Sequence, residues 1–448
     1  MSWYQQLEKI SIEARRSSII RALMYALLIA PVAAAFLAVL VFTVGGTPTS
    51  DEWSIVPYFQ YKADGTLSLV KLAEWYKVHR YLFPRILILG LGSITGWDIE
   101  WETLVGFLFL CATVFLIFQR YRAQKGNLWL FVPVGFMLFS LRQHENLFWG
   151  FQMAIYMAIL GSIYALWLLD RKVSFLHLTG ALVSAFIATF SFGMGPAVWP
   201  AGAALLLLKR QWKHLFLWIG TAVVVMAFYL QGFEVRGQQP TLLMTGALFQ
   251  IGTGAPFAFS ADVIRNKAYS LVDAVVAANM AFAVFTAIGM GIYASWKKQG
   301  GNAFWCALGL FGLGTVALIT HAEASVFVSR YSSFTMLAPV AAYVLTLHAK
   351  EKWMKTLGAI LGAMILVSVT AAFAYAPKVA QDMAALRWNQ YYSMTKGFVP
   401  YDVDFSKEEI VGHAWTMARL KIGIYRPNPR EYSGRIQKIR SKLFWLLL

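Results

Sequence analysis

The stretch ALMYALLIAPVAAAFLAVLVFTV (Ala22–Val44) contains no charged residue, and it decides what kind of protein this chain is. About 20 consecutive apolar residues are needed for a helix to cross the hydrocarbon core of a bilayer, and this run is long enough. It follows Arg15, Arg16 and Arg21 and is too long for the core of a cleavable signal peptide, so we interpret it as a membrane anchor. Residues 1–21 before it are predicted to form a short amphipathic helix on the membrane surface.

The rest of the chain has the same apolar character. Of its 448 residues 58% are hydrophobic and only 14% are charged, which is typical of a polytopic membrane protein. We therefore predict an all-α polytopic membrane protein with about eleven transmembrane helices. The predicted spans are 22–44, 103–119, 127–142, 151–169, 175–193, 196–208, 214–231, 269–296, 303–321, 333–348 and 355–376.

The basic residues of the short loops predict the orientation. With the N-terminus in the cytoplasm, the loops at 120–125, 171–172, 209–213, 297–298 and 350–355 place their lysines and arginines inside. The short loops that then face outward, 143–150, 194–195 and 322–332, hold one basic residue, Arg330. The run Tyr81–Thr95 is short and interrupted by Pro84 and glycines, so we predict an interfacial helix that returns to the outer side.

This topology divides the chain into two parts. A transmembrane module, 1–376, carries a first outer loop at 45–101 and a second large outer loop at 232–268, and a small basic segment, 377–448, follows outside. Cys111 and Cys306 fall inside predicted helices, so no disulfide or thiolate metal site is expected. The net charge of +17 is not arranged as one basic stripe with interleaved aromatic residues, which argues against nucleic acid as a partner.

Polar residues from distant parts of the sequence are predicted to meet on the outer face. A partly buried carboxylate there could accept a proton from an attacking hydroxyl, and arginines are suited to holding phosphate oxygens. The candidates are Asp51, Glu52, His79, Arg80, Arg85, Arg142, Gln143, His144, Glu145, Asn146, Gln152, Arg330 and Tyr331.

Structural alternatives remain open for several candidates. Glu145 and Asn146 could cap a helix end, and Arg142 could extend to the lipid headgroups. His79 and His144 could be interfacial histidines. No cofactor is predicted with certainty. Three of the carboxylates could together hold a divalent cation such as Mg²⁺ or Mn²⁺, although the sequence has no coordination pattern; they are Asp51, Glu52 and Glu145.

Several short motifs resemble those of the C-type superfamily of membrane glycosyltransferases, which use lipid-phosphate-linked sugars. The acidic pair Asp51-Glu52 follows the first transmembrane helix directly. The outer loop then contains His79-Arg-Tyr-Leu-Phe-Pro84 and ends in Gly90-Leu-Gly-Ser-Ile-Thr-Gly96, similar to the helix, proline and glycine run before the second membrane helix of those enzymes. The segment Gln143-His-Glu-Asn-Leu-Phe-Trp-Gly-Phe-Gln152 resembles an element of bacterial members.

The resemblance implies specific roles and a location. Asp51 would be the base, with Glu52 as its neighbour or substitute, and Arg330 in Val328-Ser-Arg-Tyr331 would contact the donor phosphate, helped by an arginine such as Arg80, Arg85 or Arg142. The protein would lie in a bacterial inner membrane, with its N-terminus cytoplasmic and its C-terminus and active site periplasmic.

The implied partners are a polyprenyl phosphate-linked sugar, membrane lipids and a glycolipid or polysaccharide acceptor, with inversion at the anomeric carbon. The small C-terminal segment carries no peptide-binding motif, which favours these acceptors over a protein. The alternatives are an O-antigen polymerase or ligase, and a lipid-linked sugar transporter or flippase. A transporter predicts ionisable residues at mid-membrane, where Asp273 is the one clear candidate.

Overall fold

The computed structural model describes residues 3–43, 48–171, 174–233, 249, 252–254, 271–297, 301–322, 329–367 and 405–425. Within these residues the protein is helical, apart from one two-stranded hairpin. The second large outer loop and most of the C-terminal segment lie outside them. An all-α protein, as the apolar runs predict, is therefore what the described residues form.

Among the residues that the structure describes, six helices are long and apolar enough to cross a membrane. They correspond to six of the eleven predicted spans, and their apolar parts are Ser18–Phe42, Ile99–Ala123, Gly150–Asp170, Trp212–Tyr229, Ala274–Trp296 and Ala303–His321. The helices that contain them are α1 (Trp3–Phe42), α5 (Ile99–Ala123), α8 (Met153–Asp170), α11 (Trp212–Tyr229), α14 (Leu271–Trp296) and α15 (Ala303–Ala322).

The other five predicted spans are shorter or broken helices, so a count of eleven is not established. Segment 127–142 is divided between η2 (Leu128–Phe131), α6 (Val132–Leu138) and η3 (Leu141–Gln143), and Pro133 stands in the first turn of α6. Segment 333–348 is divided between α16 (Ser332–Thr335) and α17 (Leu337–Leu347). Of the remaining three, two are α9 (Phe175–Thr189) and α10 (Val198–Leu208). The third, 355–376, is helical over 352–367, and 368–376 lie outside the described residues. An 11-residue helix is only about 16 Å long, which is half of the hydrocarbon core.

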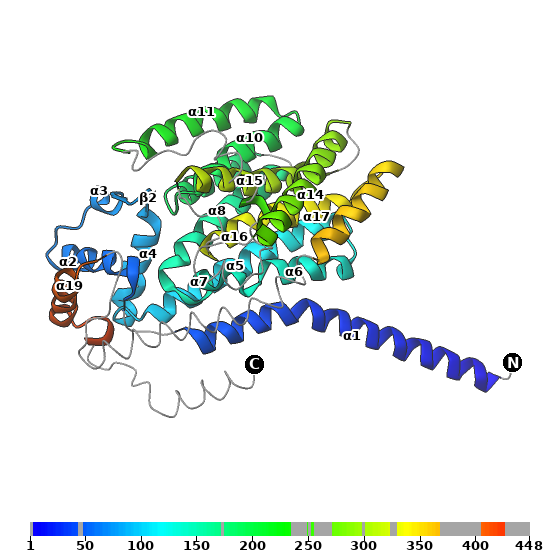
Figure 1. Ribbon diagram of the computed structural model, residues 1–448, viewed down its shortest axis with the longest axis horizontal. Coiled ribbons are helices and arrows are strands. Elements are labelled where there is room, and N and C mark those ends of the chain that lie inside the picture. Colours follow the sequence, from blue (N-terminus) through cyan, green and yellow to red (C-terminus); the bar gives the residue numbers. More distant parts are fainter. Residues whose placement is uncertain are drawn as a thin grey trace.

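Helix α1 differs from the predicted surface helix followed by a separate span. It continues for 40 residues from Trp3 to Phe42, with Pro31 inside it. Such a helix is about 60 Å long, twice the thickness of the hydrocarbon core, and Figure 1 shows it projecting beyond the bundle at its N-terminus. No glycine or proline stands before Pro31 to end a helix, which explains the continuity.

The core of the bundle lies around α8 and α15. About 72% of the apolar window of each is buried, against 33% for α1 and 22% for α11. Helix α8 packs between α5 and α9, and α15 packs between α10 and α17. In Figure 1 α1 and α11 lie on opposite sides of this core, so they are the helices that present most apolar surface outward.

The loops that are predicted to share the cytoplasmic side meet at one end of the bundle. Arg120 Nη2, from the end of α5, donates to the Gly301 carbonyl before α15 at 3.0 Å, and Arg120 also pairs with Asp170 at the end of α8. Lys209, after α10, donates to the carbonyl of Leu169 at 3.2 Å. Hydropathy and charge therefore predicted correctly which loops lie together.

The opposite end carries the first outer loop. Its elements are η1 (Ser50–Ile55), α2 (Val56–Ala63), α3 (Leu69–Leu72), β1 (Trp75–Tyr76), β2 (His79–Arg80) and α4 (Leu82–Thr95). They gather away from the N-terminus in Figure 1, together with α19 (Lys407–Leu420) of the C-terminal segment. Helix α19 packs on α2, and the Gly423 N–H after it donates to the Gly96 carbonyl at 2.8 Å. Both ends of α4 lie at this end, as a return to the same side requires.

The short elements that complete this end are η3, α7 (His144–Phe148), η4 (Gly150–Gln152), η5 (Gly195–Ala197) and η7 (Ser329–Tyr331), and η8 (Gly423–Tyr425) follows α19. The segment Gly193-Met-Gly-Pro196 joins α9 to α10 as a tight helical hairpin. A side chain at Gly195 would overlap the Ala188 carbonyl oxygen, so the close approach of the two helices requires glycine there.

Candidate functional site

A hairpin in the first outer loop holds the Asp51 carboxylate. Strands β1 and β2 pair Trp75 with Arg80 and Tyr76 with His79, which leaves a two-residue turn at Lys77 and Val78. Tyr76 Oη and Lys77 Nζ both donate to Asp51 Oδ1 at 2.7 Å. The Asp51 side chain keeps 15% of its surface exposed, so an external group can reach it.

Backbone strain accompanies this contact. Lys77 has a φ of +52° and Ser50, beside Asp51, has a φ of +49°. Residues with a side chain rarely adopt this left-handed region, and such conformations are often found at functional sites. The sequence does not predict this turn, because Lys77-Val78 lacks the glycine or asparagine of common hairpin turns. Tyr76 and Lys77 were accordingly missed by the sequence analysis.

The two acidic residues of the pair have different environments. Glu52 is only 2% exposed, and its Oε2 accepts from the Thr49 N–H at 2.8 Å in a capping box at the start of η1. Its Oε1 accepts from the Phe151 N–H at 3.4 Å. Glu52 therefore fixes the position of η1 against η4, whereas Asp51 faces the hairpin.

His79 lies buried beside Asp51's hairpin. Its Nδ1 accepts from the Gly193 N–H at 3.1 Å, and its ring stacks on Phe192 with centroids 4.2 Å apart. A side chain at Gly193 would overlap Nδ1, so this glycine is required for the contact. Burial, and after it the charges of Arg330 and Lys77, lower the pKa of His79 to about 3. The imidazole is therefore neutral, with its proton on Nε2.

The same electrostatic neighbourhood includes Arg330. Its charge acts on His79 and on Tyr81, whose pKa is raised well above its usual value by burial and then by Asp51, Tyr76 and Tyr331. Arg330 opposes that rise. Asp51 and Arg330, 279 positions apart in the numbering, therefore both lie within electrostatic reach of the buried Tyr81, and we call these three residues the Asp51–Arg330 cluster.

Glu145 and Asn146 hold the main chain of Arg330. Glu145 Oε2 accepts from the Arg330 N–H at 2.9 Å, and Asn146 Nδ2 donates to the Arg330 carbonyl at 2.7 Å. Asn146 Nδ2 also donates to Ser333 Oγ at 2.7 Å. The two side chains therefore fix the main-chain position from which the Arg330 side chain extends. This role differs from the helix cap that the sequence suggests for them. They are positioning residues for Arg330.

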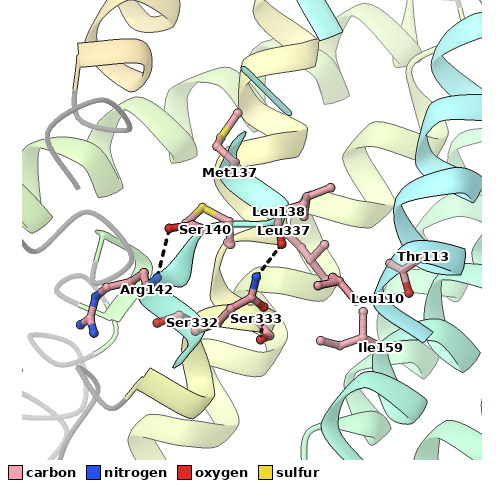
Figure 2. A pocket seen from close by; sticks show the side chains of 12 residues that line it. Leu110, Thr113, Met137, Leu138, Ser140, Arg142, Ile159, Ser332, Ser333 and Leu337 are labelled. Carbon is pink, nitrogen blue, oxygen red and sulfur yellow. Dashed lines mark hydrogen bonds between the residues drawn. The ribbon is translucent and has the colours of Figure 1, made fainter. Parts of the chain in front are cut away.

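The neighbouring polar residues pack beneath the hydrogen bonds that Glu145 and Asn146 make to the Arg330 main chain. Gln143 Oε1 accepts from Ser333 Oγ at 2.6 Å and from Tyr156 Oη at 3.1 Å, and His144 Nδ1 lies 3.2 Å from Ser329 Oγ. Figure 2 shows a cavity next to them, of about 10 Å³, lined by residues such as Ser333 and Leu110. That volume matches one water molecule, too small for a sugar or a phosphate.

Arg142 and Gln152 are the other two candidates from this region. Both are buried, at 3% and 2% exposure. In Figure 2 the side chain of Arg142 points away from the apolar lining residues of the small cavity. Gln152 Oε1 has no hydrogen-bond partner among the described residues. Tyr331 is 1% exposed and follows Arg330 directly in η7.

Arg80 and Arg85 bind the main chain of the outer loop. Arg80 Nε donates to the Tyr229 carbonyl at 2.7 Å and stacks on Trp75. Arg85 is 2% exposed, donates from Nη1 to the carbonyls of Leu72 and Glu74, both at 2.7 Å, and stacks on Tyr58. Arg80 is directed toward Tyr229 and Trp75, away from the Asp51–Arg330 cluster, whereas the charge of Arg85 also acts on Tyr76 and Tyr81. Their contacts fasten the hairpin and α3 to the bundle.

An apolar groove begins next to the cluster and runs along the bundle. It has a volume of about 910 Å³ and lies between α4, α5, α8 and α9. Phe83 and Ile187 line it; Phe83 stands two residues after Tyr81, and its N–H lies 3.4 Å from the Phe190 carbonyl. Leu116 and Tyr164 also line it, further along α5 and α8. The groove therefore covers the middle of α5 and α8, and Phe83 is its lining residue nearest in sequence to the cluster.

No metal cluster is found among the described residues: no three His, Cys, Asp or Glu side chains lie together in a way that could hold an ion. Asp51, Glu52 and Glu145 do not form one, because Glu52 caps η1 and Glu145 binds the Arg330 main chain. The cation that these three carboxylates could have shared has no site in this arrangement.

No family model, no curated protein and no solved structure matches this chain. The described residues define a helical protein with six helices able to cross a membrane, a strained, charged cluster at one end and an apolar groove between α4, α5, α8 and α9.

Proposed function

We propose that the protein is a membrane glycosyltransferase that uses a polyprenyl phosphate-linked sugar. The observation that carries this proposal is the juxtaposition of three features: an accessible Asp51 carboxylate, the Arg330 guanidinium in the same cluster, and an apolar groove that starts two residues from Tyr81. A lipid-linked sugar phosphate needs each of these, namely a base, a cation and an apolar channel.

The groove would take the polyprenyl chain from the side of the bundle. The lining of the groove is almost entirely apolar, and α4 forms one of its walls. A polyprenyl chain in the groove would therefore stay in an apolar environment. The phosphate at the end of the chain would then reach the cluster near Tyr81. Arg330 presents paired donors that suit phosphate oxygens, and its main chain is fixed by Glu145 and Asn146.

Asp51 would act as the base. It would take the proton of an acceptor hydroxyl, whose oxygen attacks the anomeric carbon as the bond from that carbon to the phosphate oxygen breaks. The electron pair of that bond leaves with polyprenyl phosphate, and Arg330 stabilises the charge that develops there. Attack opposite the leaving phosphate inverts the anomeric carbon. Tyr76 and Lys77 hold the carboxylate in place through Oδ1.

The acceptor is proposed to be a glycolipid or a polysaccharide at the periplasmic face of a bacterial inner membrane. The charge of the loops supports that orientation, since the basic loops meet at the end opposite the cluster. Helix α19 lies beside the outer loop, where a C-terminal segment could contact an acceptor.

The test uses the full chain in lipid with a panel of polyprenyl phosphate sugars. The wild type should release polyprenyl phosphate, and Asp51→Asn should not, while Asp64→Asn, which removes an exposed carboxylate from the same loop, should behave as the wild type. Release by Asp51→Asn at the wild-type rate would exclude Asp51 as the base. If folded wild type releases no polyprenyl phosphate from any donor but moves lipid-linked sugar across the bilayer, the transporter replaces this proposal.

A further inference from the structure

A second cavity lies at the other end of the bundle, where the basic loops meet. It has a volume of about 510 Å³ and is formed by the last turns of α5 and α8 and the first turn of α9. Its lining residues are Gln119, Arg120, Ala123, Trp167, Asp170, Arg171 and His177. We propose that this cavity binds the phosphate-bearing headgroup of an anionic membrane lipid.

The charges around the cavity favour an anion. Arg120 and Lys209 both pair with Asp170, so two cations share the single carboxylate, and Arg171 adds a third cation at the mouth. Lys209 also donates to the carbonyls of Leu169, Asp170 and Arg171, which neutralises the negative C-terminal end of α8. An anion in the cavity therefore meets a net positive environment.

Arg171 is the group best placed to hold the phosphate. Its guanidinium lies flat on Trp167, 3.5 Å from the ring centroid. Stacking of this kind orients the planar fork and leaves its N–H edge available for two parallel hydrogen bonds to phosphate oxygens. Its side chain makes no hydrogen bond to the described residues. His177 Nδ1 is paired with Ser174 Oγ at 2.8 Å; in the tautomer in which the hydroxyl donates to Nδ1, Nε2 carries the ring proton and can donate to the phosphate.

The surroundings of the cavity favour a lipid over a soluble anion. Phe175 and Leu176, at the start of α9, are 81% and 79% exposed, and such apolar side chains would face acyl chains. Tyr164 stacks near Trp167 with centroids 5.9 Å apart, an aromatic pair typical of a membrane interface.

The cavity also lies next to the apolar groove along α5 and α8. Trp167 stands one turn beyond Tyr164 on α8, and Gln119 stands one turn beyond Leu116 on α5; the first member of each pair lines the cavity and the second lines the groove. A lipid with its headgroup at Arg171 could therefore place an acyl chain along the furrow between α5 and α8. This arrangement holds whether or not the protein is a glycosyltransferase.

The test is binding of phosphatidylglycerol, compared with phosphatidylcholine and with inorganic phosphate, measured on the full chain by native mass spectrometry from detergent. Wild type should retain phosphatidylglycerol and not phosphatidylcholine, and inorganic phosphate should not displace it. Arg171→Gln should weaken retention about tenfold, the effect of losing a charged hydrogen bond. The matched control is Arg210→Gln, since Arg210 lies over Trp296 at the same end but outside the cavity.

Equal retention of phosphatidylglycerol by wild type and Arg171→Gln would overturn the proposal, and so would equal retention of the two lipids. Displacement by inorganic phosphate alone would assign the cavity to a soluble anion instead. Arg171 is exposed, so its replacement should not disturb folding. If Arg171→Gln nevertheless unfolds, His177→Ala provides the same comparison with the other donor.

Discussion

The turn at Lys77 gives a sharp test of how the hairpin is held. Lys77 combines a left-handed backbone with an ion pair to Asp51. Left-handed φ costs an ordinary residue about 1 kcal/mol or more, which glycine avoids. The side chain of Lys77 is 46% exposed, so its ion pair is screened and contributes about 0.5 kcal/mol. Replacing Lys77 with glycine or with alanine removes the same ammonium, but only glycine relieves the backbone strain, because alanine keeps a Cβ.

Glycine also loses more backbone entropy on folding, which reduces its advantage over alanine to about 0.5–1 kcal/mol. We therefore expect Lys77→Gly to hold the hairpin about as firmly as the wild type, and Lys77→Ala to hold it less firmly. Hydrogen exchange of the 75–81 amides, read by mass spectrometry, should be about threefold slower in the glycine variant than in the alanine variant. Faster exchange in Lys77→Gly than in Lys77→Ala would refute the strain at this turn.

Two further predictions concern the residues around Arg330. The pKa of His79 is lowered from 6.5 to about 3, so the unfolded chain binds a proton that the folded protein excludes. The stability from neutral His79 is complete above pH 6.5 and is lost as the pH falls toward 3, by about 2 kcal/mol at pH 5. Denaturant unfolding of His79→Gln, which keeps an acceptor for Gly193, should lack this decline, and equal declines would contradict the assignment. Asn146→Ala leaves the Arg330 carbonyl without its donor and should cost about 2–3 kcal/mol of unfolding free energy. Unchanged stability would show that the Asn146 hydrogen bond does not hold the Arg330 main chain.

The sequence predicted the parts of this protein that depend on composition and charge. Long apolar runs predicted six helices that the structure contains, and basic residues predicted which loops meet at one end. The same patterns do not establish the count of eleven spans, because hydropathy measures how apolar a segment is and not whether its backbone is continuous. Segment 127–142 is an example. It is apolar, but α6 has Pro133 in its first turn and ends before Leu141.

The candidate site depends on contacts that the sequence shows only in part. Asp51 and Arg330 are candidates because charges at helix ends in an apolar chain are costly, and in the structure both act on the pKa of Tyr81. Tyr76, Lys77 and Gly193 acquire their roles only through partners far away in the sequence, so no local pattern reveals them. Sequence alone also does not say which group a guanidinium meets.

Arg85 shows this last limit most clearly. In the sequence it belongs to a basic cluster suited to phosphate, but in the structure it is buried with its Nη1 donating to two main-chain carbonyls. Glu145 and Asn146 show the reverse case. The sequence leaves open a merely structural helix cap for them, but in the structure their side chains hydrogen-bond to the main chain of Arg330. In each case the deciding contact joins segments that only the folded chain brings together.

The central claim, that Asp51 and Arg330 serve one reaction in different roles, is tested most directly by measuring donor binding and turnover together. Asp51→Asn should bind a polyprenyl phosphate sugar as the wild type does and release no polyprenyl phosphate. Arg330→Gln should lose donor affinity about tenfold or more, because a charged hydrogen bond to phosphate is removed. Wild-type binding and wild-type turnover in both variants would contradict the account.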